Sequence, residues 1–418
     1  MRSLSGMIIF ILIMLLLDAY VYTAIRSISS GYADKTRYWI NIGYFSISII
    51  GILAFIYLVA THPGTSSKSM RMYVFACILG LLFAKIIVST FLLIDDVRRF
   101  IQWILQWIFP KTAHEINDLN ETEKISRSVF MSWLGLAAGT TLFSSLLYGF
   151  GNKYKYQLVR KKLHFPKLPN AFKSLKIIQI SDIHSGSFTD KQAVQKGIEL
   201  ILKQKPDLIL FTGDLVNDRA TEMQEYMDVF SQLKAPMGVY ATLGNHDYGD
   251  YVQWPVDGVS KEQNLNNLKQ VISNLGWRLL MNEHVVLEKE NQQIALLGIE
   301  NWSAKARFPK YGRLDLAYAG TEKYPFKMLM SHDPSHWHAQ VLSEYADIDL
   351  TLSGHTHGMQ FGVEIPGFRW SPVQYVYKEW AGLYEDGNAK LYVNRGFGFI
   401  GYPGRVGVLP EITLLELS

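Results

Sequence analysis

The chain has 418 residues, of which 49% are apolar and 19% are charged, and its net charge at pH 7 is +4. This length suffices for two or three domains, and the charge is too small to indicate nucleic acid as a partner. The single cysteine, Cys77, excludes an intrachain disulfide and a thiolate metal site, so any metal must be held by His, Asp, Asn or Glu.

The apolar excess is concentrated in residues 1–150, where four segments approach the roughly 20 apolar residues that a bilayer requires. We predict transmembrane helices at about residues 7–25, 40–60, 73–94 and 129–150. A signal peptide alone does not explain four such segments. The sequence therefore predicts a multi-pass integral protein of the cell (inner) membrane, with an all-α transmembrane region over residues 1–150.

Two charged side chains lie inside these segments, Asp18 in the first and Lys85 in the third. Ionisable groups within a membrane are functional candidates by default, but two groups of opposite sign also suit an ion pair. We expect these two residues to pair with each other or to reach the interface rather than to act in catalysis.

Residues 95–110 lie between the third and fourth segments and repeat aromatic and apolar side chains at helical spacing. This pattern is typical of an amphipathic helix at the membrane interface, and it also suits a continuation of the third helix.

The orientation of the chain is weakly marked, because lysines and arginines divide almost evenly between the two sides of the predicted helices. Residues 126–131, SRSVFM, resemble a twin-arginine export signal without its second arginine, which slightly favours an extracytoplasmic C-terminal domain. The basic and aromatic residues 151–171 predict a juxtamembrane linker, either as a strand and hinge or as a contact with anionic headgroups.

Five strand-like apolar runs in residues 172–418 each lead directly into a polar turn. The turns read SDIHSG, TGDLVND, GNHDY, SHDP and SGHTHG. Ligands gather at the carboxyl ends of strands in open α/β sheets, so we expect these turns to converge on one site. Carboxylate, imidazole and amide oxygen ligands suit Mn, Fe or Zn, and a pair of such ions activates water and neutralises phosphate oxygens.

Together the five turns resemble the motif set of the calcineurin-like metallophosphoesterase family, in particular its membrane-anchored bacterial branch. The resemblance covers about residues 172–418 and implies an α/β (α+β) four-layer sandwich of two mixed β-sheets flanked by helices. It also implies two divalent metal ions. Asp182, His184 and His357 would bind the first ion, and Asn245, His332 and His355 the second, with Asp214 bridging the two.

The same resemblance gives His246 another role, in which it approaches the phosphate and stabilises charge or protonates the leaving oxygen. Several relatives orient this histidine with an Asp three residues after the bridging one. Here that position is Asn217, and Asp218 follows it. We expect Asp218 to take part in catalysis, but the partner of His246 stays open.

Several other residues have two interpretations. His336 and His338 follow SHDP closely, and we expect them on a helix start or loop rim rather than among the ligands. The aromatic residues 367–384 suit a hairpin with cross-strand pairs, which we favour, or a wall of the substrate site. Arg395 and Arg405 lie in Gly-rich loops and could each meet a phosphate or be surface charges.

The resulting hypothesis is a membrane-bound binuclear-metal phosphoesterase that cleaves a phosphate ester or pyrophosphate bond by in-line attack of metal-bound hydroxide. The membrane half suggests a lipid-linked substrate, and the resemblance offers a UDP-diacylglucosamine-like molecule of lipid A biosynthesis as one case. The expected partners are a phosphorylated small-molecule or lipid substrate and membrane lipids. The alternative is a metal-binding membrane sensor or scaffold with vestigial phosphoesterase activity.

Overall fold

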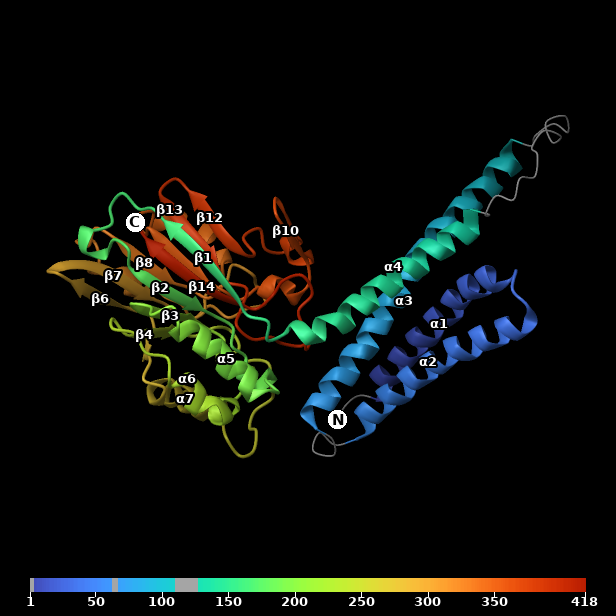
Figure 1. Cartoon of the computed structure of the whole chain (residues 1–418), viewed down its shortest axis with the longest axis horizontal. Helices are drawn as coiled ribbons and strands as arrows, with labels where there is room; N and C mark the ends of the chain where they lie inside the picture. Colours follow the sequence, from blue (N-terminus) through green and yellow to red (C-terminus); the bar gives the residue numbers. More distant parts are fainter. Residues whose placement is uncertain (1–3, 62–66, 110–126) are drawn as a thin grey trace. The chain divides into compact units, whose positions relative to one another are not determined.

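The computed structural model describes residues 4–61, 67–109 and 127–418, and the chain divides into two compact units, Met1–Tyr148 and Gly149–Ser418. Figure 1 colours both units along the sequence. The division falls beside the domain boundary that the sequence predicts at residue 150.

The first unit is built from helices. They are α1 (Leu4–Ser29), α2 (Asp34–Ala60), α3 (Lys68–Ile108) and α4 (Arg127–Gly149). Each is long and apolar enough to cross a membrane. Of the predicted export signal, residue 126 lies outside the described residues and the remainder begins α4.

Residues 95–108 continue α3 without a break. The structure therefore agrees with a continuation of the third predicted helix and has no separate interfacial helix over this stretch. The stretch contains neither glycine nor proline, and nothing in it ends the helix. Asp95 also pairs with Arg98 at 2.7 Å and Arg99 at 3.4 Å, at the three- and four-residue spacing that supports a helix. Residue 110 lies outside the described residues.

Asp18 and Lys85 form the predicted ion pair, with 2.6 Å between Lys85 Nζ and Asp18 Oδ1. Both side chains are buried. Ser48 Oγ donates to the same carboxylate oxygen at 2.6 Å, and Tyr44 OH donates to it at 3.0 Å. These bonds offset the cost of removing two charges from water, which the Coulomb attraction alone does not cover.

The second unit contains two six-stranded sheets, as the sequence predicts, and one small hairpin. The first sheet has the order β1 (Gln157–Leu163), β14 (Glu411–Leu417), β2 (Lys176–Ile180), β3 (Leu208–Thr212), β4 (Val239–Thr242), β5 (Arg278–Leu279). The second has the order β12 (Gly382–Asp386), β13 (Ala389–Val393), β9 (Leu350–Ser353), β8 (Lys327–Met330), β7 (Gln292–Gly298), β6 (Glu283–Lys289). The hairpin joins β10 (Val363–Ile365) to β11 (Phe368–Trp370).

Both large sheets mix parallel and antiparallel pairs. The pairs β2–β3 and β3–β4 are parallel, as are β7–β8 and β8–β9, whereas β14–β2 and β6–β7 are antiparallel. The accompanying helices are α5 (Lys191–Leu202), α6 (Met227–Phe230), α7 (Lys261–Asn274), α8 (Leu314–Tyr318) and α9 (Leu342–Glu344). In Figure 1, α5, α6 and α7 lie beside the sheet that contains β2, β3 and β4.

The two sheets share one hydrophobic core. Leu210 on β3 belongs to the same buried cluster as Leu296 on β7, Met328 on β8 and Leu352 on β9. Every residue of β3, LILFT, is buried, which is why this strand reads as a continuous apolar run rather than an alternating one. A core of this kind holds the carboxyl ends of the strands in a fixed arrangement.

Much of the predicted linker, residues 151–171, belongs to the first sheet. Residues 157–163 form β1, which pairs in parallel with β14 from Gln157–Glu411 to Leu163–Leu417. Residues 157–163 therefore form the strand of the first alternative, and the contact with anionic headgroups stays a prediction. Its exposed Arg160, Lys161 and Lys162 protect the open edge of the sheet from pairing with another chain.

Candidate metal centre

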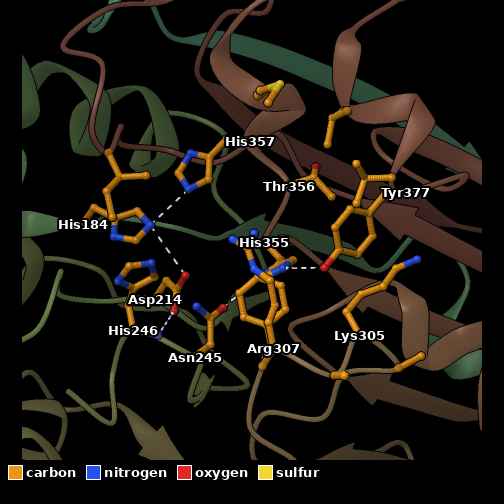
Figure 2. A pocket seen from close by; sticks show the side chains of 17 residues that line it. His184, Asp214, Asn245, His246, Lys305, Arg307, His355, Thr356, His357 and Tyr377 are labelled. Atoms are coloured by element: carbon orange, nitrogen blue, oxygen red, sulfur yellow. Dashed lines mark hydrogen bonds and ion pairs between the residues drawn. The ribbon is translucent and has the colours of Figure 1, made fainter. Parts of the chain in front are cut away.

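Each predicted ligand lies just after a strand, and the strands come from both sheets. Asp182 and His184 follow β2, Asp214 follows β3, Asn245 follows β4, His332 follows β8, and His355 and His357 follow β9. Figure 2 shows that His184, Asp214, Asn245, His355 and His357 point toward one another around one pocket. The five motifs thus meet because neighbouring parallel strands end at the same edges of the two sheets.

The turns carry unusual backbone angles at the ligands. The φ values are positive at five of them, Asp182 (53°), His184 (48°), Asp214 (61°), His355 (72°) and His357 (50°). A left-handed conformation at a residue other than glycine costs about 1–3 kcal/mol and persists only where the surroundings enforce it. The fold therefore holds these side chains against local preference, as is typical of functional sites.

The first ligand group consists of Asp182, His184 and His357, all buried, with one potential ligand atom of each within 4.8 Å of the others. His357 Nε2 lies 3.1 Å from Asp182 Oδ1 and 3.0 Å from His184 Nε2. Two imidazole nitrogens and a carboxylate oxygen that converge in this way form a donor set that suits a divalent transition metal.

The second group consists of Asp214, His332 and His355. Asn245 joins it, because its Oδ1 lies 2.8 Å from His355 Nδ1. Asp214 Oδ2 lies 3.1 Å from His332 Nε2 and 3.6 Å from His184 Nε2, so this carboxylate stands between the two groups. The arrangement fits the bridging role that the resemblance implies for Asp214.

The electrostatics of the site favour the protonation states that metal ligands need. Burial would raise the pKa of Asp214, but the neighbouring His332, His246 and His184 together outweigh burial and hold that pKa well below its usual range. Burial lowers the pKa of His184 well below its usual value and also lowers that of His355. Near neutral pH this part of the site thus presents an ionised carboxylate at Asp214 and neutral imidazoles at His184 and His355, the forms that bind metal.

His332 is the exception in the absence of metal. Burial would lower its pKa, but the carboxylate of Asp214 raises it to about 10. Its Nδ1 lies 2.6 Å from the carbonyl oxygen of Thr212, which can only accept, so Nδ1 carries a proton and Nε2 faces Asp214. A cation at Nε2 would take the place of the second proton.

Asp247 organises the loops around the site, and the sequence analysis did not assign it. Its buried carboxylate accepts hydrogen bonds from the backbone N–H groups of Asp214 (2.9 Å), Leu215 (2.8 Å), Val216 (3.2 Å) and Gly244 (2.9 Å). Burial and then the charge of Asp214 raise the pKa of Asp247 to about 7. Its place in the GNHDY turn was the only sequence signal for this role.

Asp333 and Tyr377 contact the Nε2 side of the His355 ring. Tyr377 OH lies 2.8 Å from His355 Nε2 and donates to Asp333 Oδ2 at 3.1 Å, and the same carboxylate oxygen lies 3.4 Å from His355 Nε2. A partner on one ring nitrogen orients the ring and leaves the other nitrogen, here Nδ1, for a metal. Asp333 stands in the SHDP turn, and Tyr377 lies in the aromatic stretch 367–384.

Arg405 and Arg395 have neither of the roles that the sequence suggested. Arg405 is fully buried and donates to the backbone carbonyls of His357 (3.1 Å), Arg395 (2.8 Å), Gly396 and Gly398. Arg395 pairs with Glu364 at 2.6 Å. Both guanidinium groups therefore hold the C-terminal loops together instead of facing a phosphate or solvent.

His246 is held by the backbone and not by the carboxylate of Asp218. Its backbone N–H donates to Asp214 Oδ1 at 2.9 Å, and its Nδ1 lies 2.7 Å from the carbonyl oxygen of Asn217. A carbonyl only accepts, so Nδ1 carries the proton and Nε2 is left for a ligand. Asp218 Oδ1 has no hydrogen-bond partner among the described residues, and the expected catalytic part for Asp218 stays a prediction. The backbone carbonyl of Asn217, one residue before Asp218, already accepts the hydrogen bond from His246 Nδ1.

The remaining expectations concern residues near the site. His336 bonds Ser331 Oγ and Gln340 Oε1, both at 2.9 Å, and His338 Nε2 lies 3.0 Å from Glu379 Oε1. Neither histidine belongs to a ligand group in the described part of the chain. Residues 367–384 do not form one hairpin, because β11 pairs with β10 and β12 pairs with β13.

The pocket in front of the ligands has a volume of about 630 Å³ (Figure 2). Two cations line it, Lys305 and Arg307, and Lys305 Nζ lies 5.4 Å from the centre of the Tyr377 ring. The apolar part of the wall is made of Phe308, Met359, Val373, Val376 and Ile400. The wall of the pocket thus contains both cationic and apolar side chains.

Comparison with known proteins is decisive for the family. Residues 175–359 match the family model "Calcineurin-like phosphoesterase". The chain is 30% identical over 301 residues to the phosphodiesterase YaeI of Escherichia coli, which covers 70% of this chain and 99% of YaeI. The chain belongs to the calcineurin-like phosphoesterase family. This membership confirms the resemblance and supports a metal-dependent phosphohydrolase.

The membrane half of this calcineurin-like phosphoesterase is matched as well. Residues 1–152 match the model "Probable Calcineurin-like phosphoesterase, transmembrane domain", which agrees with the four apolar helices and shows a membrane protein. The uncharacterized metallophosphoesterase YkuE of Bacillus subtilis is 29% identical over 71% of this chain and 99% of YkuE. A zebrafish transmembrane protein with metallophosphoesterase domain is 28% identical over 63% of this chain, and the match spans 57% of the zebrafish protein.

Proposed function

We propose that this phosphoesterase hydrolyses a phosphate ester or pyrophosphate bond at a pair of divalent metal ions. The observation that carries the proposal is the position of Asp214, whose carboxylate lies between two groups of buried ligands. A metal pair held there would supply an activated water and would neutralise the phosphate oxygens. In-line attack by that water on phosphorus is the mechanism we propose.

The residues of the chain itself supply positioning and proton transfer. His246 lines the pocket beside Asp214, and its Nε2 is the nitrogen left for a substrate. When protonated, it can stabilise charge on the phosphate and give its proton to the leaving oxygen. Lys305 and Arg307 are charged donors for a further anionic group of the substrate.

We further propose that the substrate is a phosphorylated amphiphile. Support comes from the apolar side of the pocket, formed by Phe308, Met359, Val373 and Val376, together with the membrane-spanning character of the first unit. A lipid-linked phosphate, for example a UDP-diacylglucosamine-like molecule, combines the charged and the apolar parts that such a pocket accepts.

For the topology we propose a four-pass inner-membrane protein with an extracytoplasmic catalytic unit. The support is the similarity of residues 126–131 to an export signal. Protease added to spheroplasts, whose outer membrane is opened, would cleave the catalytic unit in this topology, whereas cleavage only after lysis of the spheroplasts would place the unit in the cytoplasm.

The alternative function, a sensor or scaffold with vestigial activity, is disfavoured by the complete ligand set and by the position of His246. The decisive experiment measures hydrolysis of bis(p-nitrophenyl) phosphate by the full-length protein after chelation and after addition of manganese. We expect turnover only with metal, and its loss in Asp214→Asn. Asp228→Asn, at an exposed position on α6, is the matched control.

A wild-type protein without turnover, or an active Asp214→Asn variant, would overturn the proposed reaction. The substrate class has its own test. Phosphate release from a phosphorylated lipid in mixed micelles should exceed release from its water-soluble, deacylated counterpart. Equal rates would leave the reaction standing and refute the amphiphile.

A further inference from the structure

One face of the catalytic unit exposes a group of apolar side chains, here called the apolar rim. Its members and their exposed fractions are Met359 (56%), Val363 (42%), Ile365 (59%), Phe368 (54%), Tyr375 (77%) and Val376 (56%). Scattered exposed apolar residues are normal on soluble proteins, but a continuous apolar patch marks a site of interaction with a protein, a membrane or a ligand.

The members of the rim are connected in space. Ile365 and Phe368 are paired residues of the β10–β11 hairpin, and Val363 pairs with Trp370. The indole Nε1 of Trp370 lies 3.4 Å from Tyr375 OH, which links the hairpin to the next loop. Met359 and Val376 both line the substrate pocket, so the rim extends from the hairpin to the mouth of that pocket.

The hairpin presents its apolar side outward because of an ion pair on its other side. Successive side chains of a strand point to opposite faces, so Glu364 faces away from Val363 and Ile365. Its carboxylate pairs with Arg395 at 2.6 Å, and that guanidinium is almost buried. Shifting the strand by one residue would bury Val363 and Ile365 but would break this pair. The protein thus keeps the charge inside and the apolar residues outside, the reverse of an ordinary hairpin in water.

The base of the hairpin lies beside the point where the chain enters the catalytic unit. Gly362 N donates to the carbonyl of Val406 at 2.9 Å, and the backbone N–H of Arg405 donates to the carbonyl of Gly149 at 3.0 Å. Phe150 also packs on Tyr402, with 5.6 Å between the ring centres. Gly149 is the last residue of α4, a helix long and apolar enough to span a membrane, so we expect the loop that binds Gly149 to lie near a membrane surface.

Basic residues accompany the rim. Lys378 is exposed two residues after Val376, and Arg307 is exposed at the pocket. Arg369 lies on the other face of the hairpin, opposite Glu364, and donates to the carbonyl of Ala381. Apolar side chains flanked by Lys and Arg form the pattern by which surface segments bind lipid: the apolar groups enter the boundary of headgroups and acyl chains, and the cations meet anionic headgroups.

We propose that the apolar rim docks on the lipid surface, with the tip of the β10–β11 hairpin below the headgroups and the pocket mouth facing the bilayer. This docking goes beyond the proposed reaction and does not depend on it, because it follows from the exposed residues and the chain entry alone. It provides a route by which a molecule could pass between the bilayer and the pocket.

The test measures the depth of single fluorescent labels in the full-length protein. Cys77 is the only cysteine, so a Cys77→Ala background accepts one label at Ile365→Cys, and separately at Phe368→Cys. The matched control is Leu316→Cys on α8, an equally exposed apolar residue outside the rim (55%). The protein is reconstituted into vesicles of phosphatidylcholine and phosphatidylglycerol, with and without lipids that carry a nitroxide on the acyl chain.

We expect nitroxide lipids to quench the labels at residues 365 and 368 at least about twofold more than the label at residue 316, as for groups roughly 5–10 Å deep in the boundary region. Equal quenching at all three positions would overturn the docking. A label shielded from water but not quenched would assign the rim to a protein partner or a second copy and would also refute the proposal. Hydrolysis of bis(p-nitrophenyl) phosphate by each labelled variant checks the fold and tests the reaction separately.

Discussion

Each unit of this phosphoesterase buries a cluster of ionisable side chains, and the two clusters compared next are built on opposite principles. In the membrane unit, Asp18 meets Lys85 at 2.6 Å and Ser48 donates to the same oxygen, so acceptor and donor charges balance. In the catalytic unit, imidazole and carboxylate acceptors face one another, as the 3.0 Å between His184 Nε2 and His357 Nε2 shows. Burial of charged groups is common to both.

The difference teaches that burial of ionisable groups does not identify a reactive site. A buried pair of opposite charges satisfies itself and has no further need of a ligand. A set of converging acceptors lacks a positive charge at its centre, and a divalent cation supplies it. The membrane cluster should therefore govern stability, and the catalytic cluster should govern metal binding and turnover.

The largest effect should follow from His246→Gln. We expect kcat to fall by about 10²–10⁴-fold while the metal content stays near that of the wild type, because His246 transfers a proton and is not a ligand. Metal analysis and turnover are measured on the same preparation, and His338→Gln at the His338–Glu379 pair is the control. The loss should be larger for an alkyl leaving group than for nitrophenol. A proportional loss of metal would contradict the separate role.

The next effect belongs to the membrane cluster. Lys85→Met leaves the buried carboxylate of Asp18 without its cation and should destabilise the membrane unit by about 3–5 kcal/mol. Unfolding in mixed micelles with increasing SDS measures this change. The double variant Asp18→Leu/Lys85→Met should recover most of the lost stability. If the losses of stability in the two single variants add up in the double variant, Asp18 and Lys85 do not act as a pair. A loss of turnover at full metal occupancy would contradict the assignment of this cluster to stability alone.

A smaller effect is expected for Arg405→Lys. Lysine cannot reproduce the fork that binds the carbonyls of His357, Arg395 and Gly398, so the loop that holds His357 should loosen. We expect metal affinity to fall by about 10–100-fold, with kcat at saturating manganese largely retained. Metal titration followed by turnover measures both quantities, and Arg278→Lys on the exposed edge strand β5 is the control. Unchanged metal affinity would show that Arg405 does not support the metal site.

The smallest effect on turnover is expected for Asp218→Asn, since the carbonyl of Asn217 orients His246. Burial raises the pKa of Asp218 to about 6, above the ordinary value near 3.9, so the folded state favours the protonated carboxyl. Its contribution to stability is complete below about pH 4 and is lost as the pH rises through 6. The variant should flatten this fall in the thermal midpoint of the metal-free protein. A large loss of kcat would show that Asp218 takes part in catalysis.

Local sequence patterns predicted much of the fold and most of the metal centre. The four apolar helices follow from runs of about 20 residues without a break, since the bilayer sets that length. The ligands Asp182, Asp214 and His357 could be located because each follows an apolar strand directly, and parallel strands of a sheet end at one edge. Their assignment to two metal ions came from the family resemblance.

The neighbours of the ligands could not be predicted in the same way. Arg405 reaches His357 across 48 positions, and the carbonyl of Thr212 meets His332 across 120. Such contacts depend on how two sheets pack and leave no local periodicity. For the same reason the sequence left the partner of His246 open, and the fold places the carbonyl of Asn217 there.

The sequence by itself determined the four long apolar helices, the strands that end in polar turns and the residue types available for metal. The tertiary structure alone decided that β1 is an edge strand of the first sheet, beside β14, and which groups hold the ligand rings. It also decided that Val363 and Ile365 face outward. The physical reason is that strand periods and helix lengths are properties of neighbouring residues, whereas partners and exposed faces depend on the packing of segments far apart in the chain.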